Sequence, residues 1–106
     1  MVVVPASMGS VGRIASGVSL SLIERAADVM LKERRRLVVV VRETPYSLIH
    51  LRNMTTLTEA GAVVLPASPS FYSGAESVEE LAMTITERVV AHLGVELPHY
   101  EWQSEK

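Results

Sequence analysis

Short apolar runs alternate with longer amphipathic segments along this chain. The runs Val2–Val4, Leu37–Val41 and Ala62–Leu65 are continuous, and continuous β-branched runs are typical of strands buried on both faces of a parallel sheet. The segments between them repeat apolar residues at helical spacing. Buried strands that alternate with amphipathic helices predict an α/β layer fold with right-handed crossovers.

Serines mark the starts of the predicted helices. Helices are expected at residues 11–15, from 21 to about 35, from 47 to 61, and from 77 to just before 94. Ser21 and Ser77 are each followed three residues later by a glutamate, which is the spacing of a capping box. Gly61 is expected to follow the last turn of the third helix. Gly12 and Gly17 weaken the prediction of the first helix, at residues 11–15.

The chain opens directly with the run Val2–Val4. A buried parallel strand needs a neighbour on each side, and three strands make a thin sheet for burial on both faces. We therefore expect the chain to begin in the middle of a larger sheet. Residues 1–94 are expected to form part of one domain. Residues 95–106 form a polar tail with Pro98 and Trp102, which we expect to be an arm that packs on a partner.

Composition excludes several classes of function. The 106 residues carry a formal net charge of −2, which gives no electrostatic reason to expect a nucleic-acid partner. The absence of cysteine excludes disulfides and thiolate metal sites and fits a cytoplasmic location. The three histidines are far apart and have no metal-ligand spacing. No metal site is therefore expected. No apolar run approaches the roughly 18–20 residues of a membrane span, so no membrane span is expected either.

Polar loops follow all three predicted strands. They contain Ser7-Met-Gly-Ser10, then Arg42 and Glu43, then a segment from Pro66 to Tyr72. Parallel strands end at one edge of a sheet, and open α/β sheets bind ligands at that edge. The small residues 7–10 precede a helical segment, where backbone N–H groups could meet an anion. An ordinary strand-to-helix turn is the alternative for this loop.

The cations near the second predicted helix each allow two interpretations. Arg25 lies in the first turn, where a cation opposes the helix macrodipole, so it either pairs with Asp28 or meets an anionic ligand. Lys32 and residues 34–36 form a basic cluster at the end of this helix, where the dipole favours cations. A solvated helix end is the default for the three arginines.

The remaining candidates lie in loops and on the last helix. Arg42 and Glu43 either pair with neighbours or belong to a site in which Glu43 moves a proton. Tyr72 is either a lid over the core or a ligand contact, and Arg88 is either a surface residue or a ligand contact. Together with the cations above, these residues would suit an anionic, phosphorylated ligand at the sheet edge.

Six segments of the chain resemble the UbiX-type flavin prenyltransferases. They are Val3-Val-Pro-Ala-Ser-Met8, Glu24-Arg-Ala-Ala-Asp-Val29, Leu31-Lys-Glu-Arg-Arg-Arg-Leu37, Arg42-Glu-Thr-Pro45, Gly61-Ala-Val-Val-Leu-Pro66 and Phe71-Tyr72. The resemblance runs from about Val2 to Leu93 and covers only the carboxyl-terminal half of a typical member. It implies a three-layer Rossmann- or flavodoxin-like parallel sheet with flanking helices.

The resemblance also implies an activity and its partners. Members transfer a dimethylallyl group from dimethylallyl phosphate to reduced FMN without a metal, and UbiD-type decarboxylases use the prenylated flavin. They assemble into large homo-oligomers, here expected to be a dodecamer. The implied FMN-binding residues are Ser7, Met8, Gly9, Ser10 and Arg42. The residues implied around the prenyl phosphate are Arg25, Lys32, Tyr72 and Arg88, and the implied proton-handling residue is Glu43.

The chain departs from the pattern of the resembled family in three ways. Ala6 replaces a common cysteine, Ser10 replaces a threonine, and the half that carries the family's Gly-Ala-Ser-Gly phosphate loop is missing. That half is expected on another chain or lost by truncation. Two alternatives stay open: a flavoprotein of the type that decarboxylates a C-terminal cysteine, and an FMN-binding or oligomerisation fragment without catalysis.

Overall fold

A computed structural model describes residues 1–69, 74 and 76–94. The elements in chain order are β1 (Val2–Ala6), α1 (Met8–Ser16), α2 (Leu22–Lys32), β2 (Val38–Val41), α3 (Leu48–Glu59), β3 (Val63–Pro66) and α4 (Val78–His92). The chain divides into two compact units, Met1–Pro66 and Ala67–Lys106, and each is described by itself. The first unit contains the three strands and α1 to α3, and the second contains α4.

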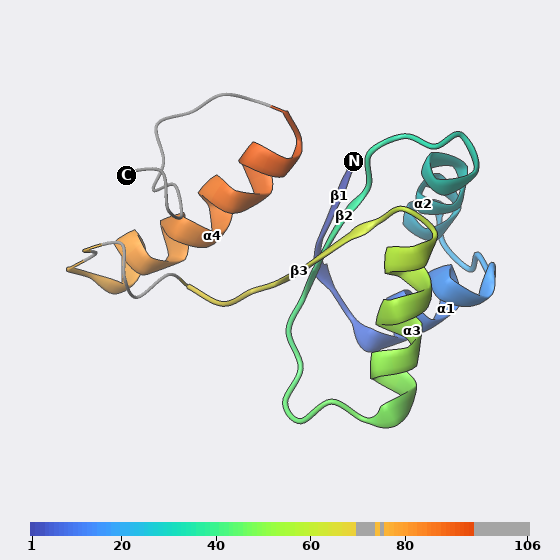
Figure 1. Cartoon of the computed structure of the whole chain (residues 1–106), viewed down its shortest axis with the longest axis horizontal. Helices are drawn as coiled ribbons and strands as arrows, with labels where there is room; N and C mark the ends of the chain where they lie inside the picture. Colours follow the sequence, from blue (N-terminus) through green and yellow to red (C-terminus); the bar gives the residue numbers. More distant parts are fainter. Residues whose placement is uncertain (70–73, 75, 95–106) are drawn as a thin grey trace. The chain divides into compact units, whose positions relative to one another are not determined.

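A parallel sheet with the strand order β1-β2-β3 forms the centre of the first unit. Helices α1, α2 and α3 lie on the same side of it (Figure 1). All four valines of the middle strand β2 are at most 2% exposed, so this strand is buried, as its continuous apolar run predicts. The predicted parallel α/β architecture is therefore confirmed.

Every helix of the first unit contributes apolar side chains to its core. Val11 and Ile14 of α1, Ala27 of α2 and Leu57 of α3 are all buried and belong to one cluster with Val39 of β2. These aliphatic side chains fill the space between the helices and the sheet. The core is thus built without aromatic residues, in line with an aromatic content of only 5%.

Strand β1 is less buried than its sequence suggests. Among the described strands it pairs only with β2, so it forms one edge of the sheet, and Val4 is 57% exposed. The register with β2 shifts between Val3 and Ala6, where Pro5 has no N–H to donate to the ladder. The expectation that this strand is buried on both faces is wrong for the described sheet.

Helix α2 ends earlier than predicted, at Lys32 rather than near Arg35. Arg34 adopts a left-handed conformation with φ of 55°, and the N–H of Arg35 donates to the carbonyl of Met30 at 2.8 Å. This closed turn ends the helix before β2. Residues 34–36 therefore form the connection between α2 and β2 and not the helix end itself.

Helix α1 is longer than predicted, because it begins directly after β1. Ser7 has extended backbone angles and its Oγ accepts the N–H of Ser10, so it caps a helix that starts at Met8. Gly17, with φ of 76°, ends the helix. The cap places α1 immediately at the carboxyl end of β1, and Gly12 is accommodated inside the helix.

The predicted serine caps of α3 and α4 are confirmed. Ser47 accepts the N–H of His50 and donates its own N–H to His50 Nδ1, which completes a capping box. Gly61 follows α3 with φ of 108°, as predicted. Ser77 accepts the N–H of Glu80 at the start of α4. No helix among the described residues is both long and apolar enough to span a membrane.

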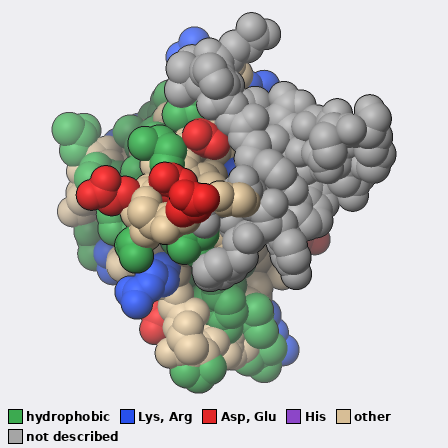
Figure 2. Space-filling model, turned by 90° about the vertical axis from the view of Figure 1, so that its left-hand side faces the viewer, with side chains coloured by type: hydrophobic (Ala, Val, Ile, Leu, Met, Phe, Trp, Pro, Cys, Tyr) green, Lys and Arg blue, Asp and Glu red, His purple; other side chains and the backbone are tan. Residues whose placement is uncertain are grey.

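Several large apolar side chains lie on the surface of the first unit. They are Val4, Val18, Leu20, Leu22, Ile23, Tyr46, Leu48, Ile49 and Leu51. Figure 2 shows a different face, seen from the side of Figure 1 on which α4 is drawn, where acidic side chains lie beside hydrophobic ones. Contiguous apolar surface is characteristic of faces that contact other proteins.

We expect Leu57→Ala to lower the free energy of unfolding by about 2–5 kcal/mol, because it leaves a cavity beneath α3. Leu57 is 1% exposed. The control is Leu48→Ala, in the same helix, where the side chain is 60% exposed. Urea titration measures both values. Equal destabilisation by the two variants would contradict the described core.

Candidate functional site

The segment Ser7–Ser10, called here the serine loop, joins β1 to α1 and forms the first turn of the helix. Ser7 Oγ accepts the N–H of Ser10 at 3.0 Å. The first N–H groups of a helix have no partner within the helix, and this cap satisfies only one of them. Those of Met8 and Gly9 are therefore available to a ligand at the carboxyl end of β1.

The pairing of β1 with β2 brings a second predicted group to the same place. Ala6 pairs with Val41 in the ladder between the two strands. The serine loop follows Ala6, and Arg42 and Glu43 follow Val41. Neighbouring strands lie about 4.8 Å apart. Both Arg42 and Glu43 are exposed, and no ion pair or hydrogen bond holds either one within the described residues. The register thus brings the backbone of Arg42 and the start of the serine loop to the same edge of the sheet.

An ion pair that the sequence patterns did not indicate lies next to this loop. Arg13 Nε and Glu24 Oε2 are 2.7 Å apart, and the side chain of Glu24 is only 3% exposed. Glu24 also accepts the N–H of Leu20 at 2.8 Å and the hydroxyl of Ser10 at 3.4 Å. One carboxylate therefore connects the serine loop, α1 and the entry to α2.

The role of Glu24 differs from the predicted one. The spacing from Ser21 indicates a capping box, and Ser21 Oγ does accept the N–H of Glu24 at 3.2 Å. The carboxylate, however, turns to Leu20 and Arg13 instead of returning to Ser21. Only half of the box forms, because a cation and a free N–H group compete for the same carboxylate oxygens.

The surroundings of Glu24 keep it ionised. The N–H of Leu20, then the side chain of Arg13 and the hydroxyl of Ser10, lower the pKa of the Glu24 carboxyl below its ordinary value near 4.5, and they outweigh burial, which raises it. The charge of Arg13 adds to the lowering. At neutral pH the pair is therefore a carboxylate with a guanidinium.

The two α2 residues predicted near a phosphate have partners on their own helix or directly after it. Arg25 Nη1 lies 3.1 Å from Asp28 Oδ2, so the predicted alternative of a local pair is the one observed. Lys32 Nζ lies 3.3 Å from Glu33 Oε2. Both cations are more than half exposed, and pairs of this kind are weak enough to be exchanged for a ligand.

Lys32 ends the helix that leads into the start of β2, whereas Arg42 and Glu43 follow the end of that strand. The structure does not place the last two predicted residues at the sheet edge either. Tyr72 lies outside the described residues. Arg88 lies on α4 in the second unit, where its Nη2 is 3.3 Å from His92 Nε2. The predicted roles of both residues stay predictions.

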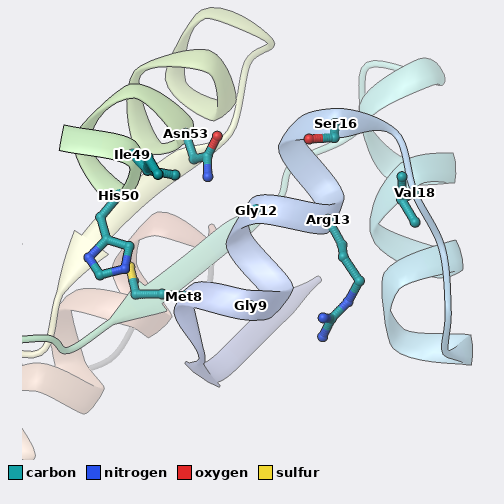
Figure 3. Close-up of a pocket in the computed structure, with 9 residues that line it drawn as sticks. All are labelled: Met8, Gly9, Gly12, Arg13, Ser16, Val18, Ile49, His50 and Asn53. Carbon is teal, nitrogen blue, oxygen red and sulfur yellow. The ribbon is translucent and has the colours of Figure 1, made fainter. Parts of the chain in front are cut away.

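A cavity of about 420 Å³ opens over the exposed side of α1 (Figure 3). Its lining residues are Met8, Gly9, Gly12, Arg13, Ser16, Val18, Ile49, His50 and Asn53. Met8 and Gly9 belong to the serine loop, so the cavity is continuous with it. At Gly12 a Cβ would lie 3.2 Å from Asn53 Nδ2, so this glycine lets α1 and α3 approach closely. The described residues include no group of three or more metal-ligating His, Cys, Asp or Glu side chains.

A parallel α/β sheet with an open, helix-capping loop at the end of an edge strand is the architecture of a nucleotide- or flavin-binding domain. The chain belongs to the Flavoprotein family, whose model matches residues 1–92. The UbiX flavin prenyltransferase of Synechocystis sp. is 50% identical to it over 104 residues, which cover 97% of this chain and 50% of that protein. The corresponding enzyme of Pseudomonas aeruginosa is 52% identical over 95 residues, or 90% of this chain and 46% of that protein.

Solved structures agree with this assignment. AnUbiX in complex with FMN and dimethylallyl pyrophosphate has a TM-score of 0.88 and 48% identity, with 97% of this chain and 57% of that one covered. A dodecameric FMN-dependent UbiX-like decarboxylase from Escherichia coli O157:H7 has a TM-score of 0.91 and 42% identity, with coverages of 98% and 57%. The resemblance to UbiX-type flavin prenyltransferases and the predicted fold class are confirmed. The chain spans about half the length of the curated relatives that it matches.

We expect the stability of the chain to depend on the charge of Glu24. Its folded-state pKa is lowered, so its contribution is complete above the ordinary pKa near 4.5 and is lost as the pH falls through the lower folded-state value. The free energy of unfolding, measured by urea titration between about pH 2.5 and pH 6 around the ordinary Glu value, should fall more steeply in the wild type than in Glu24→Gln.

Glu33→Gln is the control for this comparison, because Glu33 is exposed and pairs only at the surface. It should retain the wild-type dependence on pH. A Glu24→Gln curve parallel to that of the wild type would show that Glu24 does not have a lowered pKa in the folded chain.

Proposed function

We propose that this chain is the carboxyl-terminal part of a flavin prenyltransferase, which transfers a dimethylallyl group from dimethylallyl phosphate to reduced FMN. The observation that carries the proposal is the register of β1 and β2, in which Ala6, directly before the serine loop, pairs with Val41, directly before Arg42. The similarity to UbiX proteins, one of them in complex with FMN and dimethylallyl pyrophosphate, supports it. We place this reaction in the cytoplasm.

The proposed flavin contacts are at the sheet edge. Ser7, Met8, Gly9 and Ser10 would hold FMN through the open N–H groups and hydroxyls of the serine loop, and Arg42 would bind it from the neighbouring strand end. These donors fit a ligand rich in carbonyl and phosphate oxygens. FMN serves here as the acceptor substrate, and the proposal needs no metal.

The proposed phosphate contacts are Arg25, Lys32, Tyr72 and Arg88. During transfer, the allylic carbon would form a bond to a nucleophilic ring atom of reduced FMN, which gives up its proton. The bond between the allylic carbon and its phosphate oxygen breaks, and the electron pair leaves with the phosphate. Cations placed around that oxygen stabilise the negative charge that develops on it. Glu43 lies at the same edge as the serine loop and is exposed, so it can pass a proton to the departing phosphate.

The proposal includes partners that complete the site. The relatives are about twice as long as this chain, so we propose that an amino-terminal half of the same fold, on this or another polypeptide, supplies the rest of the flavin site. We also propose a homo-oligomer, as large as the dodecamer of the Escherichia coli relative, in line with the exposed apolar side chains of the first unit. A UbiD-type decarboxylase would use the product.

A second candidate is a flavin-binding or oligomerisation fragment without catalysis. The observation that favours it is the span of only about half of each relative. Incubation with reduced FMN and dimethylallyl phosphate, followed by mass detection of the adduct, separates the two candidates. The reaction is run with and without the amino-terminal half of the Synechocystis relative. Flavin bound without any adduct in either mixture would favour the fragment.

We expect Glu43→Gln to retain FMN affinity and to lose most prenyl transfer, roughly 100-fold or more, because general acid–base groups commonly contribute that much. The amide keeps the shape of the side chain and cannot supply a proton. Glu59→Gln, at the exposed end of α3, is the matched control and should transfer at the wild-type rate. Full activity of Glu43→Gln would remove Glu43 from the mechanism.

We expect Lys32→Ala to weaken the binding of dimethylallyl phosphate more than the binding of FMN, because the lost ammonium is assigned to the phosphate and not to the flavin. Affinities for both ligands are measured by titration. Arg35→Ala removes an exposed cation from the following turn and should change neither value. An equal loss for both ligands in Lys32→Ala would contradict the assignment.

A further inference from the structure

Arg13 presents two nitrogens to the ligand side of the serine loop. Its side chain runs along α1 toward the first turn, so the guanidinium reaches the level of Gly9 (Figure 3). A Cβ built at Gly9 would lie 3.3 Å from Arg13 Nη1 and 3.6 Å from Nη2. The absence of a side chain at Gly9 therefore leaves the space that the guanidinium occupies.

Glu24 fixes the direction of this guanidinium. The short contact at Nε engages one corner of a rigid, planar group, and Glu24 is itself held by the N–H of Leu20. Because the guanidinium is planar, holding Nε restricts where Nη1 and Nη2 can point. No ion pair or hydrogen bond to Nη1 or Nη2 occurs within the described residues.

The side chain of Arg13 is accessible beside the serine loop. Arg13 lines the cavity together with Met8 and Gly9, and 38% of its side chain is exposed. Glu24 balances the charge of Arg13, so the guanidinium acts there as an oriented pair of donors more than as a net positive charge. Such a pair suits an electron-rich oxygen of a ligand that is seated on the serine loop.

We propose that Arg13 is a further ligand-binding residue of the flavin site, donating from Nη1 and Nη2 to an acceptor oxygen of the flavin, and that Glu24 is its positioning residue. The inference rests on the proposed function, since it takes the serine loop as the flavin site. A phosphate oxygen and a ring carbonyl oxygen share the required chemistry. The experiment separates these two sources.

The first arm uses the double variant Arg13→Met with Glu24→Gln, which removes both charges together and leaves no unpaired buried carboxylate. FMN and riboflavin affinities are measured for the chain mixed with the amino-terminal half of the Synechocystis relative. We expect at least a tenfold loss of FMN affinity. If only the affinity for FMN falls, the acceptor of Arg13 is a phosphate oxygen. If the affinities for both ligands fall, the acceptor is a ring carbonyl oxygen. Unchanged affinity for both overturns the proposal.

The second arm uses Gly9→Ala, whose Cβ would lie 3.3 Å from Arg13 Nη1 and would push the guanidinium a few tenths of an ångström from its position. Alanine is a better helix former than glycine, so the free energy of unfolding should stay equal or rise. The substitution should weaken FMN binding clearly in the wild-type background and much less in the double variant, because the guanidinium is then absent. Equal losses in both backgrounds would mean that Gly9→Ala acts on the loop and not through Arg13, against the proposal.

Single Glu24→Gln tests positioning separately from contact. It retains Arg13 and loses the charge that anchors Nε, so FMN affinity should fall to a value between the wild type and the double variant. Wild-type affinity in this variant would show that Glu24 positions nothing. Absence of flavin binding by the wild-type mixture would overturn the proposed function and this inference together, whereas flavin binding that is the same in the wild type and the variants would overturn the inference alone.

Discussion

The parallel pairing of β1 with β2 is the constraint on which the site depends. Ala6 and Val41 are register partners, so the residues that follow them leave the sheet side by side. A slip of one residue in this ladder would turn the neighbouring side chains to the other face of the sheet and would separate the serine loop from Arg42. Four buried valines in β2 hold the register, because each has a defined place in the core.

The ion pair of Arg13 and Glu24 is the second fixed point of the first unit. A buried carboxylate is costly unless it is paired and hydrogen-bonded, and Glu24 satisfies this condition with Ser10 and Arg13 of α1 and with Leu20, which precedes α2. The pair therefore ties the start of α1 to the start of α2. It also makes the position of the serine loop depend on Leu20, which precedes α2, and on Glu24, which lies in the first turn of α2.

Local patterns predicted most of the fold because they report local physics. The valine run of β2 and the serine caps at Ser47 and Ser77 each depend on a few consecutive residues, and the structure contains all of them. The end of α2 was placed too late, because a left-handed arginine at position 34 ends the helix where glycine would be expected. The early start of α1 follows from Ser7, a cap that the glycines nearby obscured.

The candidate site was predictable only in part. Ser7, Ser10 and Arg42 follow strands directly, so the topology alone brings them to one edge. Arg13 and Glu24 are eleven residues apart, and their contact exists only once α1 and α2 have packed. The capping-box spacing at Ser21 gave Glu24 a sufficient local explanation, which concealed its longer-range partner. The cavity has walls from α1 and α3, a pairing that no short motif encodes.

The open edge of β1 has a consequence for association. Within the described residues this strand pairs on one side only, and an unpaired strand edge offers its N–H and C=O groups to any extended chain that it meets, including another copy of itself. Leu20, Leu22 and Ile23, all more than half exposed, add apolar surface to the same unit. A strand that added to this edge would satisfy those backbone groups and, by occupying the edge, would also prevent its pairing with unrelated chains.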